Sequence, residues 1–168
     1  MPFPRRAIRR WLPAVGGSKS VLLVLVTYAS VNEHSASVRT TLFERPFLTL
    51  TYDEQNRWLH AQWRGRLTLE AVREGSEEVL ALVRAKRYQR LLNDNTRVTE
   101  LGLSEEEQAG YQIMHLLFEA GLHYLAWIYA PVPQGRSYAE NSVAVAGWPL
   151  ILTFEEYGPA AEWLRQAP

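Results

Sequence analysis

From Phe43 onward, short apolar runs bounded by turn-forming residues alternate along the chain with segments of helical periodicity. Residues 47–52 alternate between apolar and polar positions, residues 58–63 form a second short run, and the polar residues 53–56 join the two. Two such runs around a short polar turn are typical of a β-hairpin. We therefore predict a sheet that opens with an antiparallel pair.

After the hairpin, the pattern predicts strands that alternate with helices. Apolar side chains recur at helical spacing over 68–86, 104–120, 137–146 and a segment after Pro159, whereas 88–92, 124–130 and 150–154 are short apolar runs. Each strand–helix–strand unit favours a parallel, right-handed crossover. The predicted fold class is α/β: a small mixed sheet of four to five strands in the order β-β-α-β-α-β-α-β-α, with helices packed on it.

Several residues mark the expected ends of these elements. Thr68 is a suitable N-cap for the first long helix, and Ser104 to Glu107 form a capping box for the second. That second helix is expected to end at Gly121, a natural C′ residue. The run at 124–130 is the most hydrophobic and is expected to be covered on both faces of the sheet.

Residues 1–42 form a basic N-terminal extension, which we separate from the domain at 43–168. Residues 1–40 hold six Arg or Lys side chains and one Glu. The stretches 5–10 and 21–26 resemble the charged and apolar parts of a secretory signal, although a Pro- and Gly-containing segment separates them and no cleavage site follows. Three interpretations stay open: a disordered or dispensable tail upstream of the real start, a secretory signal, or an extra strand or surface helix.

Composition excludes several classes of site. The chain has no Cys, which excludes disulfides, thiolate nucleophiles and Cys-based zinc sites. After residue 40 there are 17 acidic and 12 basic side chains, which argues against a nucleic-acid partner. The apolar run at 21–26 is far shorter than the roughly 20 residues of a membrane span. No glycine-rich phosphate loop is present, and no cofactor is predicted.

The polar stretch Asn93-Asp94-Asn95-Thr96, with Thr99, is the candidate ligand or partner face. It follows a strand that is predicted to be parallel, and open α/β sheets bind ligands at the carboxyl ends of such strands. An Asp among amides and hydroxyls could hold a cation or a polar ligand. Alternatively, these residues turn the chain, with their side chains bonded to nearby backbone.

The chain offers no catalytic motif and no metal site, so we predict a protein without enzymatic activity. The three histidines of the domain, His60, His115 and His123, do not have metal-ligand spacing and are expected at the surface or in a satisfied interior position. No nucleophile elbow is present. Along 58–63, Trp58 and Trp63 fall on opposite faces of the strand, so each face carries a Trp that packs in the core or lines a groove.

Four stretches, in their order and spacing, resemble a known family. They are Trp63-Arg64-Gly65, Leu91-Leu92-Asn93-Asp94, Gly121-Leu122-His123-Tyr124-Leu125-Ala126-Trp127, and Phe154 with Ala161, Trp163 and Leu164. They resemble the SpoIIAA-like branch of the STAS superfamily, whose fold is shared with CRAL-TRIO lipid-transfer domains. The resemblance spans residues 43–166 and implies a bacterial, cytoplasmic, non-enzymatic module that binds a partner protein or a ligand.

The resemblance also implies a site of phosphorylation. In the anti-sigma-factor antagonists of this superfamily, a partner kinase phosphorylates a Ser in an Asp-Ser-Ser/Thr-Gly motif at a helix start. This chain lacks the motif. Ser104 stands at a comparable place and is the candidate phosphorylation site, although the three Glu residues that follow it would repel a phosphate.

Two functions follow as expectations. The first is a regulatory STAS-like module that binds an unidentified protein partner and has a modest interior space. The second is a carrier or sensor of a lipid or small apolar ligand in a CRAL-TRIO-like pocket, for which we expect a closed apolar cavity of several hundred cubic ångströms. A homodimer through an exposed sheet edge or helix face is a further partner prediction.

Overall fold

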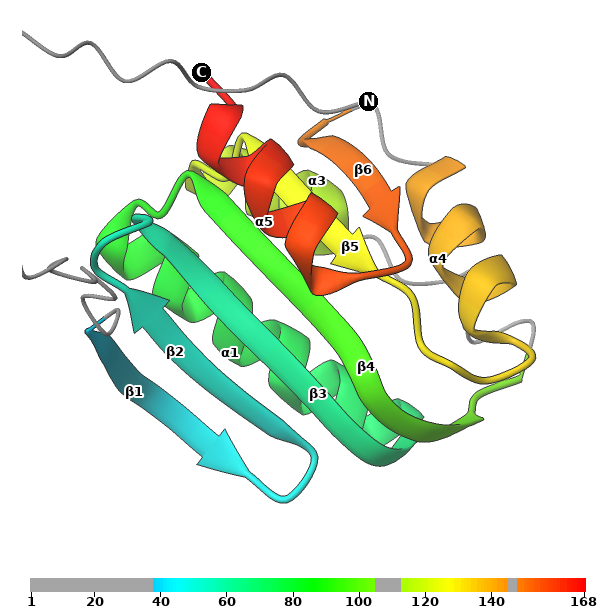
Figure 1. The fold of residues 1–168 in the computed structure, drawn as a ribbon. Helices are drawn as coiled ribbons and strands as arrows, with labels where there is room; N and C mark the ends of the chain where they lie inside the picture. Colours follow the sequence, from blue (N-terminus) through cyan, green and yellow to red (C-terminus); the bar gives the residue numbers. More distant parts are fainter. Residues whose placement is uncertain (1–37, 105–112, 145–147) are drawn as a thin grey trace, which may run out of the picture. The chain divides into compact units, whose positions relative to one another are not determined.

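The computed structural model describes residues 38–104, 113–144 and 148–168, all within one compact unit that spans Ser35–Pro168 (Figure 1). The strands are β1 (Arg39–Arg45), β2 (Leu48–Asp53), β3 (Trp58–Thr68), β4 (Arg90–Gly102), β5 (Tyr124–Ile128) and β6 (Leu150–Phe154). The helices are α1 (Leu69–Lys86), α3 (Ile113–Ala120), α4 (Gly135–Ala144) and α5 (Tyr157–Gln166). The Glu residues of the predicted capping box and the end of the helix predicted at 137–146 lie outside the described residues, as do residues 1–37.

The strands form one mixed sheet whose spatial order follows the chain, from β1 to β6. The predicted hairpin is confirmed as β2 and β3, with Leu48 opposite Trp63 and Asp53 opposite Trp58. Strands β3 to β6 pair in parallel, as the crossover rule predicts. The α/β class is therefore confirmed, with six strands in the described part of the chain where the sequence predicted four to five.

The additional strand is β1, which crosses the boundary predicted between residues 42 and 43. It pairs antiparallel with β2, with an irregularity between Thr41 and Phe43. Most of its side chains are exposed, as is usual for an edge strand, so its hydrophobic pattern is weak. The Arg39 guanidinium lies 3.5 Å from the buried carboxylate of Asp53, which ties the start of β1 to the end of β2.

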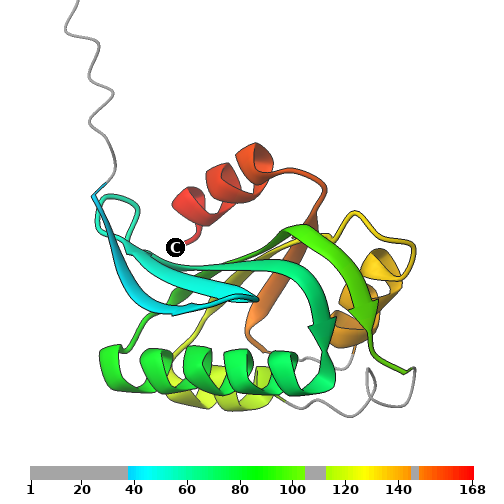
Figure 2. The same cartoon turned by 90° about the horizontal axis from the view of Figure 1, so that it is seen from below.

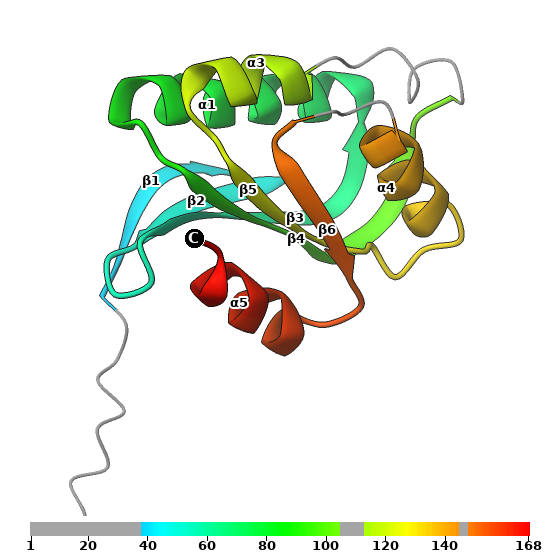
Figure 3. The ribbon, with the colours of Figure 1, turned by 90° about the horizontal axis from the view of Figure 1, so that it is seen from above.

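Helices cover both faces of the sheet. Helices α1 and α3 lie side by side on one face, and α5 lies on the other (Figures 2 and 3). The larger core, between α1 and α3 and the sheet, contains Trp63 and Trp127, while Trp58 belongs to a smaller core under α5. The two Trp residues of β3 therefore serve opposite faces, as the alternation predicts. Helix α4 lies beside the edge strand β6 (Figure 1).

Strand β4 is longer than the sequence suggested. The prediction that this strand stops at Asn93-Asp94-Asn95 is wrong, because it continues to Gly102. Pairing with β5 ends at Asp94, and beyond that point β4 pairs only with β3. Relative to β3, β4 gains a residue between the pairs Gln62–Asp94 and Arg64–Arg97, and such bulges increase local twist and re-aim side chains. Figure 2 shows the ends of both strands curving toward α1.

Two predicted helix signals are confirmed, whereas two predicted helix starts are wrong by two residues: α4 begins at Gly135 rather than at 137, and α5 begins at Tyr157, ahead of Pro159. The Thr68 hydroxyl accepts a hydrogen bond of 3.3 Å from the Ala71 N–H and caps α1. Gly121, with φ +116°, follows α3, and the Leu122 N–H bonds to the Leu117 carbonyl. None of the helices in the described ranges combines the length and the apolar content that crossing a bilayer requires.

Candidate functional site

Strand alternation divides the candidate residues between the two faces of the sheet. Asn93 and Asn95 point to the side covered by α1 and α3, where they line a cavity, whereas Asp94 points to the side covered by α5. All three are buried, with exposed fractions of 8%, 7% and 4% for Asn93, Asn95 and Asp94. The residues that were predicted to form a turn therefore belong to two separate polar sites, which lie on opposite faces of β4.

On the α5 face, Asp94 is the centre of a hydrogen-bond network. Its Oδ1 accepts a bond of 2.7 Å from the Thr96 hydroxyl and one of 3.0 Å from the Thr96 N–H. Its Oδ2 lies 3.4 Å from His60 Nε2 and 3.4 Å from Gln62 Nε2. Both of the latter side chains come from β3, so the carboxylate joins β3 to β4 through their side chains.

The environment of Asp94 favours its ionised form. Burial raises the pKa of the carboxyl, but the hydrogen bonds from His60 and Thr96 and the charge of His60 lower it more. The net pKa of Asp94 therefore lies well below its ordinary range. A carboxylate held this firmly as an anion is unsuited to proton transfer near neutral pH.

Helix α5 covers this network through its first residue. The Tyr157 ring lies 5.8 Å from the His60 ring, between centroids, and the Tyr157 hydroxyl accepts a bond of 3.1 Å from Arg39 Nη2. His60 is buried and has a partner, as predicted for a satisfied interior histidine. This group of side chains, which we call the α5-side network, therefore links β1, β3, β4 and α5. Its polar groups interact with one another.

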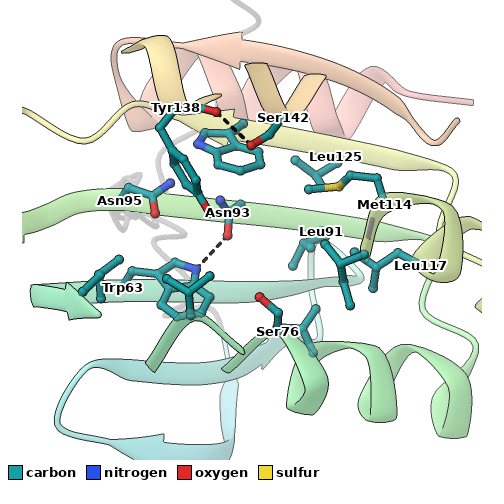
Figure 4. Close-up of a pocket in the computed structure, with 15 residues that line it drawn as sticks. Trp63, Ser76, Leu91, Asn93, Asn95, Met114, Leu117, Leu125, Tyr138 and Ser142 are labelled. Atoms are coloured by element: carbon teal, nitrogen blue, oxygen red, sulfur yellow. Dashed lines mark hydrogen bonds between the residues drawn. The ribbon is translucent and has the colours of Figure 1, made fainter. Parts of the chain in front are cut away.

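On the opposite face, a cavity lies between the sheet and helices α1, α3 and α4 (Figure 4). Its volume is about 50 Å³, measured as the space open to the centre of a water molecule. One water needs roughly 10–15 Å³ on this measure, so there is room for about four. Of the described residues that line it, the polar ones are Asn93, Asn95, Ser76, Ser142 and Tyr138, and the others are apolar or tryptophan.

The two asparagine amides are oriented by their protein partners. Trp63 Nε1, which can only donate, bonds to Asn93 Oδ1 at 2.8 Å. Asn95 Nδ2 donates to the Ile128 carbonyl, which can only accept, at 2.9 Å. Each amide therefore uses one end to bind the protein. Among the described residues, Asn93 Nδ2 and Asn95 Oδ1 have no hydrogen-bond partner.

Aromatic side chains form much of the cavity wall. Trp63 comes from β3 and Trp127 from β5, and the Tyr138 ring of α4 packs edge-on against Trp127 at 5.9 Å. Gly75 lets α1 approach Trp63 closely: a Cβ there would lie 2.7 Å from Trp63 Cζ3 and 2.7 Å from Leu48 Cδ2. The glycine thus fixes the position of the ring whose N–H orients Asn93.

Thr96 is exposed on β4 but belongs to the Asp94 network through its hydroxyl and N–H. The remaining candidate residues lie away from both sites: Thr99 is exposed on β4, and Ser104 is exposed just beyond its end. His115 is on the surface of α3, 3.1 Å from Glu119, and His123 is exposed at the start of β5. In the parts of the chain that the structure describes, no three His, Cys, Asp or Glu side chains are grouped as metal ligands.

Sequence reasoning missed Tyr138 and Ser142 as parts of this lining, and it placed Asn93 and Asn95 in a turn. One signal was available: Ser76 interrupts the apolar stripe of the first long helix, so a hydroxyl faces the sheet there. Trp63 and Trp127 also occupy inward positions on strands that the crossover rule brings close. The approach of α4 has no comparable signal, because its helical periodicity is weak.

None of three comparisons, with models of protein families, with curated proteins and with solved structures, finds a match to this chain.

Proposed function

We propose that this protein is a non-enzymatic STAS-like module that binds a protein partner and acts in regulation. The observation that carries this proposal is the exposed apolar surface at β6. Trp148, Leu150 and Leu152 are 59%, 46% and 42% exposed, and the Trp148 ring stacks on Phe118 at 5.7 Å. Leu150 and Leu152 lie on β6 itself, whereas Trp148 precedes it and contacts α3. Exposed large apolar side chains at the edge of a sheet are typical of protein interaction sites.

The position of these side chains suits a partner. Leu150 and Leu152 lie opposite Tyr124 and Ala126 of β5 and therefore point to the same face as α5. Strand β6 is also the last strand of the sheet, next to the C-terminal helix. A partner placed there would cover these apolar side chains.

The size of the cavity bears on the second candidate, a lipid carrier. Space for about four waters cannot take a fatty acyl chain, which has many more carbon atoms than that. The asparagine amides at its base would also face an alkyl chain without hydrogen-bond partners, at a cost of about 1–3 kcal/mol each. We therefore favour the protein-binding module over the carrier.

The experiment is affinity capture from a lysate of the protein's own organism, with Leu150→Lys/Leu152→Lys and Val38→Lys as a matched pair of baits. Val38 is 67% exposed and precedes β1, at the opposite edge of the sheet. We expect a protein that the wild type and Val38→Lys retain and that the double variant loses. Light scattering identifies the case in which that protein is a second copy of this chain.

Two further readouts decide the remaining expectations. A stoichiometric lipid in an organic extract, with the same proteins captured by all three baits, would overturn the proposal in favour of a carrier. Intact mass of the native protein tests the phospho-switch, with Ser104→Ala and Thr99→Ala to locate the modified residue. A phosphate that disappears in Ser104→Ala, and a change of captured protein in Ser104→Asp, would place the regulation at Ser104.

A further inference from the structure

Two hydrogen-bonding groups in the cavity under α1, α3 and α4 have no partner among the residues that the structure describes. Asn93 Nδ2 is a donor and Asn95 Oδ1 is an acceptor, and both belong to side chains more than nine-tenths buried. Buried polar groups without a partner are costly, so such groups normally face ordered water or a ligand. In Figure 4, both side chains rise from β4 toward Tyr138 and the centre of the cavity.

The chemistry of the lining limits what can bind. Among the described residues that line the cavity, none has a charged side chain. An ionised ligand would lose its hydration there without gaining a counter-charge, which excludes carboxylates, phosphates and ammonium groups. The rings of Trp63, Trp127 and Tyr138 offer flat apolar walls, which suit a planar or ring-shaped molecule.

We propose that this cavity is a binding site for a small, uncharged molecule of the lactam or cis-amide class. Asn93 and Asn95 are two residues apart on one strand, so their side chains leave the backbone roughly 6.6 Å from each other. A lactam carries its carbonyl oxygen and its N–H on one edge. It accepts from Asn93 Nδ2 and donates to Asn95 Oδ1, and it lies between the aromatic walls. This inference concerns a small molecule and does not depend on the proposed protein partner.

The size of the cavity sets the size of the probe. Space for about four waters corresponds to a ring of about five or six heavy atoms, since apolar atoms pack more densely than liquid water. The probe is 2-pyrrolidinone, a five-membered lactam with both groups. N-methyl-2-pyrrolidinone lacks the donor, and butyrate has a similar size with a charge, so the two serve as matched control probes.

The experiment is a titration of the full chain, labelled with ¹⁵N, followed by NMR. The indole N–H of Trp63 and the side-chain amides of Asn93 and Asn95 report on the site directly, and Trp63→Phe identifies the indole signal. We expect 2-pyrrolidinone to shift these signals in a saturable way, with a dissociation constant of about 1 mM, as is usual for so small a probe. The N-methyl probe should bind at least about tenfold more weakly, and butyrate should leave the signals unchanged.

Ser76→Leu and Glu77→Leu form the matched pair of variants. Both add the same side chain to α1, but Ser76 lines the cavity whereas Glu77 is exposed. We expect Ser76→Leu to abolish the lactam shifts while the rest of the spectrum stays dispersed, and Glu77→Leu to retain them. Ser142→Leu fills the cavity from α4 and repeats the test if Ser76→Leu does not fold.

Equal shifts with all three probes, or lactam shifts that survive in a well-folded Ser76→Leu, would overturn the inference. The inference also fails if saturating lactam leaves the Trp63 indole signal in place, because the cavity then holds only water. Each of these results leaves the captured-partner experiment unaffected, so failure of the lactam site is separable from failure of the protein-binding function.

Discussion

Asp94 and Asn95 are adjacent in the chain and almost equally buried, yet their side chains, on opposite faces of the sheet, differ in how completely they are hydrogen-bonded. On the α5 face, the carboxylate of Asp94 is bonded by Thr96, His60 and Gln62, and the protein supplies every partner. On the cavity face, Asn95 donates to the Ile128 carbonyl, and its oxygen has no partner among the described residues. Burial and polarity alone therefore do not identify a binding site. The informative feature is a buried donor or acceptor that has no partner in the protein.

This contrast assigns separate roles to the two clusters. A closed network contributes to stability and should respond to mutation mainly through unfolding. An amide that uses only one of its two ends to bond the protein contributes less to stability. Its mutation should mainly change ligand binding. Four sets of variants test this division, in order of decreasing effect on stability.

Asp94→Ala should have the largest effect, a loss of about 3 kcal/mol in the free energy of unfolding, because it leaves the buried His60 and the less buried Gln62 and Thr96 without their acceptor. Asn95→Ala should cost only about 1 kcal/mol, since a single hydrogen bond is lost. Urea denaturation of both variants makes the measurement. Thr99→Ala, on the exposed end of the same strand, serves as the control and should change stability by less than about 0.5 kcal/mol. Equal losses in Asp94→Ala and Asn95→Ala would remove the distinction between the faces.

Gly75→Ala should come next and should disturb the cavity face alone. The added methyl group would meet the Trp63 ring and Leu48, and overpacking of about 3 kcal/mol is partly offset by the better helix propensity of Ala, about 1 kcal/mol. We expect a net loss of about 2 kcal/mol and a displaced Trp63 indole signal. Gly158→Ala is the control on α5, where an added Cβ meets nothing within 4 Å; it should be neutral or slightly stabilising. Unchanged stability in Gly75→Ala would mean that α1 does not fix Trp63.

Asp94→Asn keeps the size of the side chain and isolates the contribution of the charge. The folded-state pKa of Asp94 lies below its unfolded value, so the stabilisation is complete above the ordinary carboxyl pKa of about 3.9 and is lost as the pH falls below it. We expect the free energy of unfolding of the wild type to exceed that of Asp94→Asn by about 1.5 kcal/mol at neutral pH. The difference should shrink steadily once the pH drops below about 4, as urea midpoints across pH would record. A difference that does not vary with pH would contradict an ionised network.

Thr96→Val should have the smallest effect, because it removes one hydroxyl bond to Asp94 and leaves the Thr96 N–H bond in place. The expected loss is about 1 kcal/mol or less. Thr99→Val makes the same change at an exposed position that lacks this partner. Identical unfolding curves for the two valine variants would show that the hydroxyl adds nothing to the network.

Sequence patterns predicted the order of the elements because those patterns depend on local periodicity. The β2–β3 hairpin, the Thr68 cap, the Gly121 stop and the parallel crossovers all follow from spacing within short windows. Strand β1 was missed because an exposed edge strand needs no apolar alternation.

The candidate site was only partly predictable, for a different reason. Three consecutive polar residues suggested a turn, and Asp94 does bond locally to Thr96, two residues on. Each of the three also has a partner about 30 residues away along the chain: Trp63 for Asn93, His60 for Asp94 and Ile128 for Asn95. Such partners become visible only when the sheet is assembled. The burial of polar residues in the middle of a strand can therefore be predicted only after the pairing of neighbouring strands is known.

Strand β3 and helix α1 meet without a connecting loop, because Thr68 is both the last residue of the strand and the cap of the helix. This junction should tolerate no change in chain length. One residue inserted after Thr68 would turn α1 by about 100° and move Glu74 into the place of Gly75 against the Trp63 ring. The turn between Asp53 and Trp58 is also closed by hydrogen bonds, from Asn56 to the Asp53 carboxylate, but its length does not set the rotation of a helix, so it can vary more. Relatives of this protein should therefore differ in length at the hairpin and keep an unbroken passage from strand to helix at Thr68.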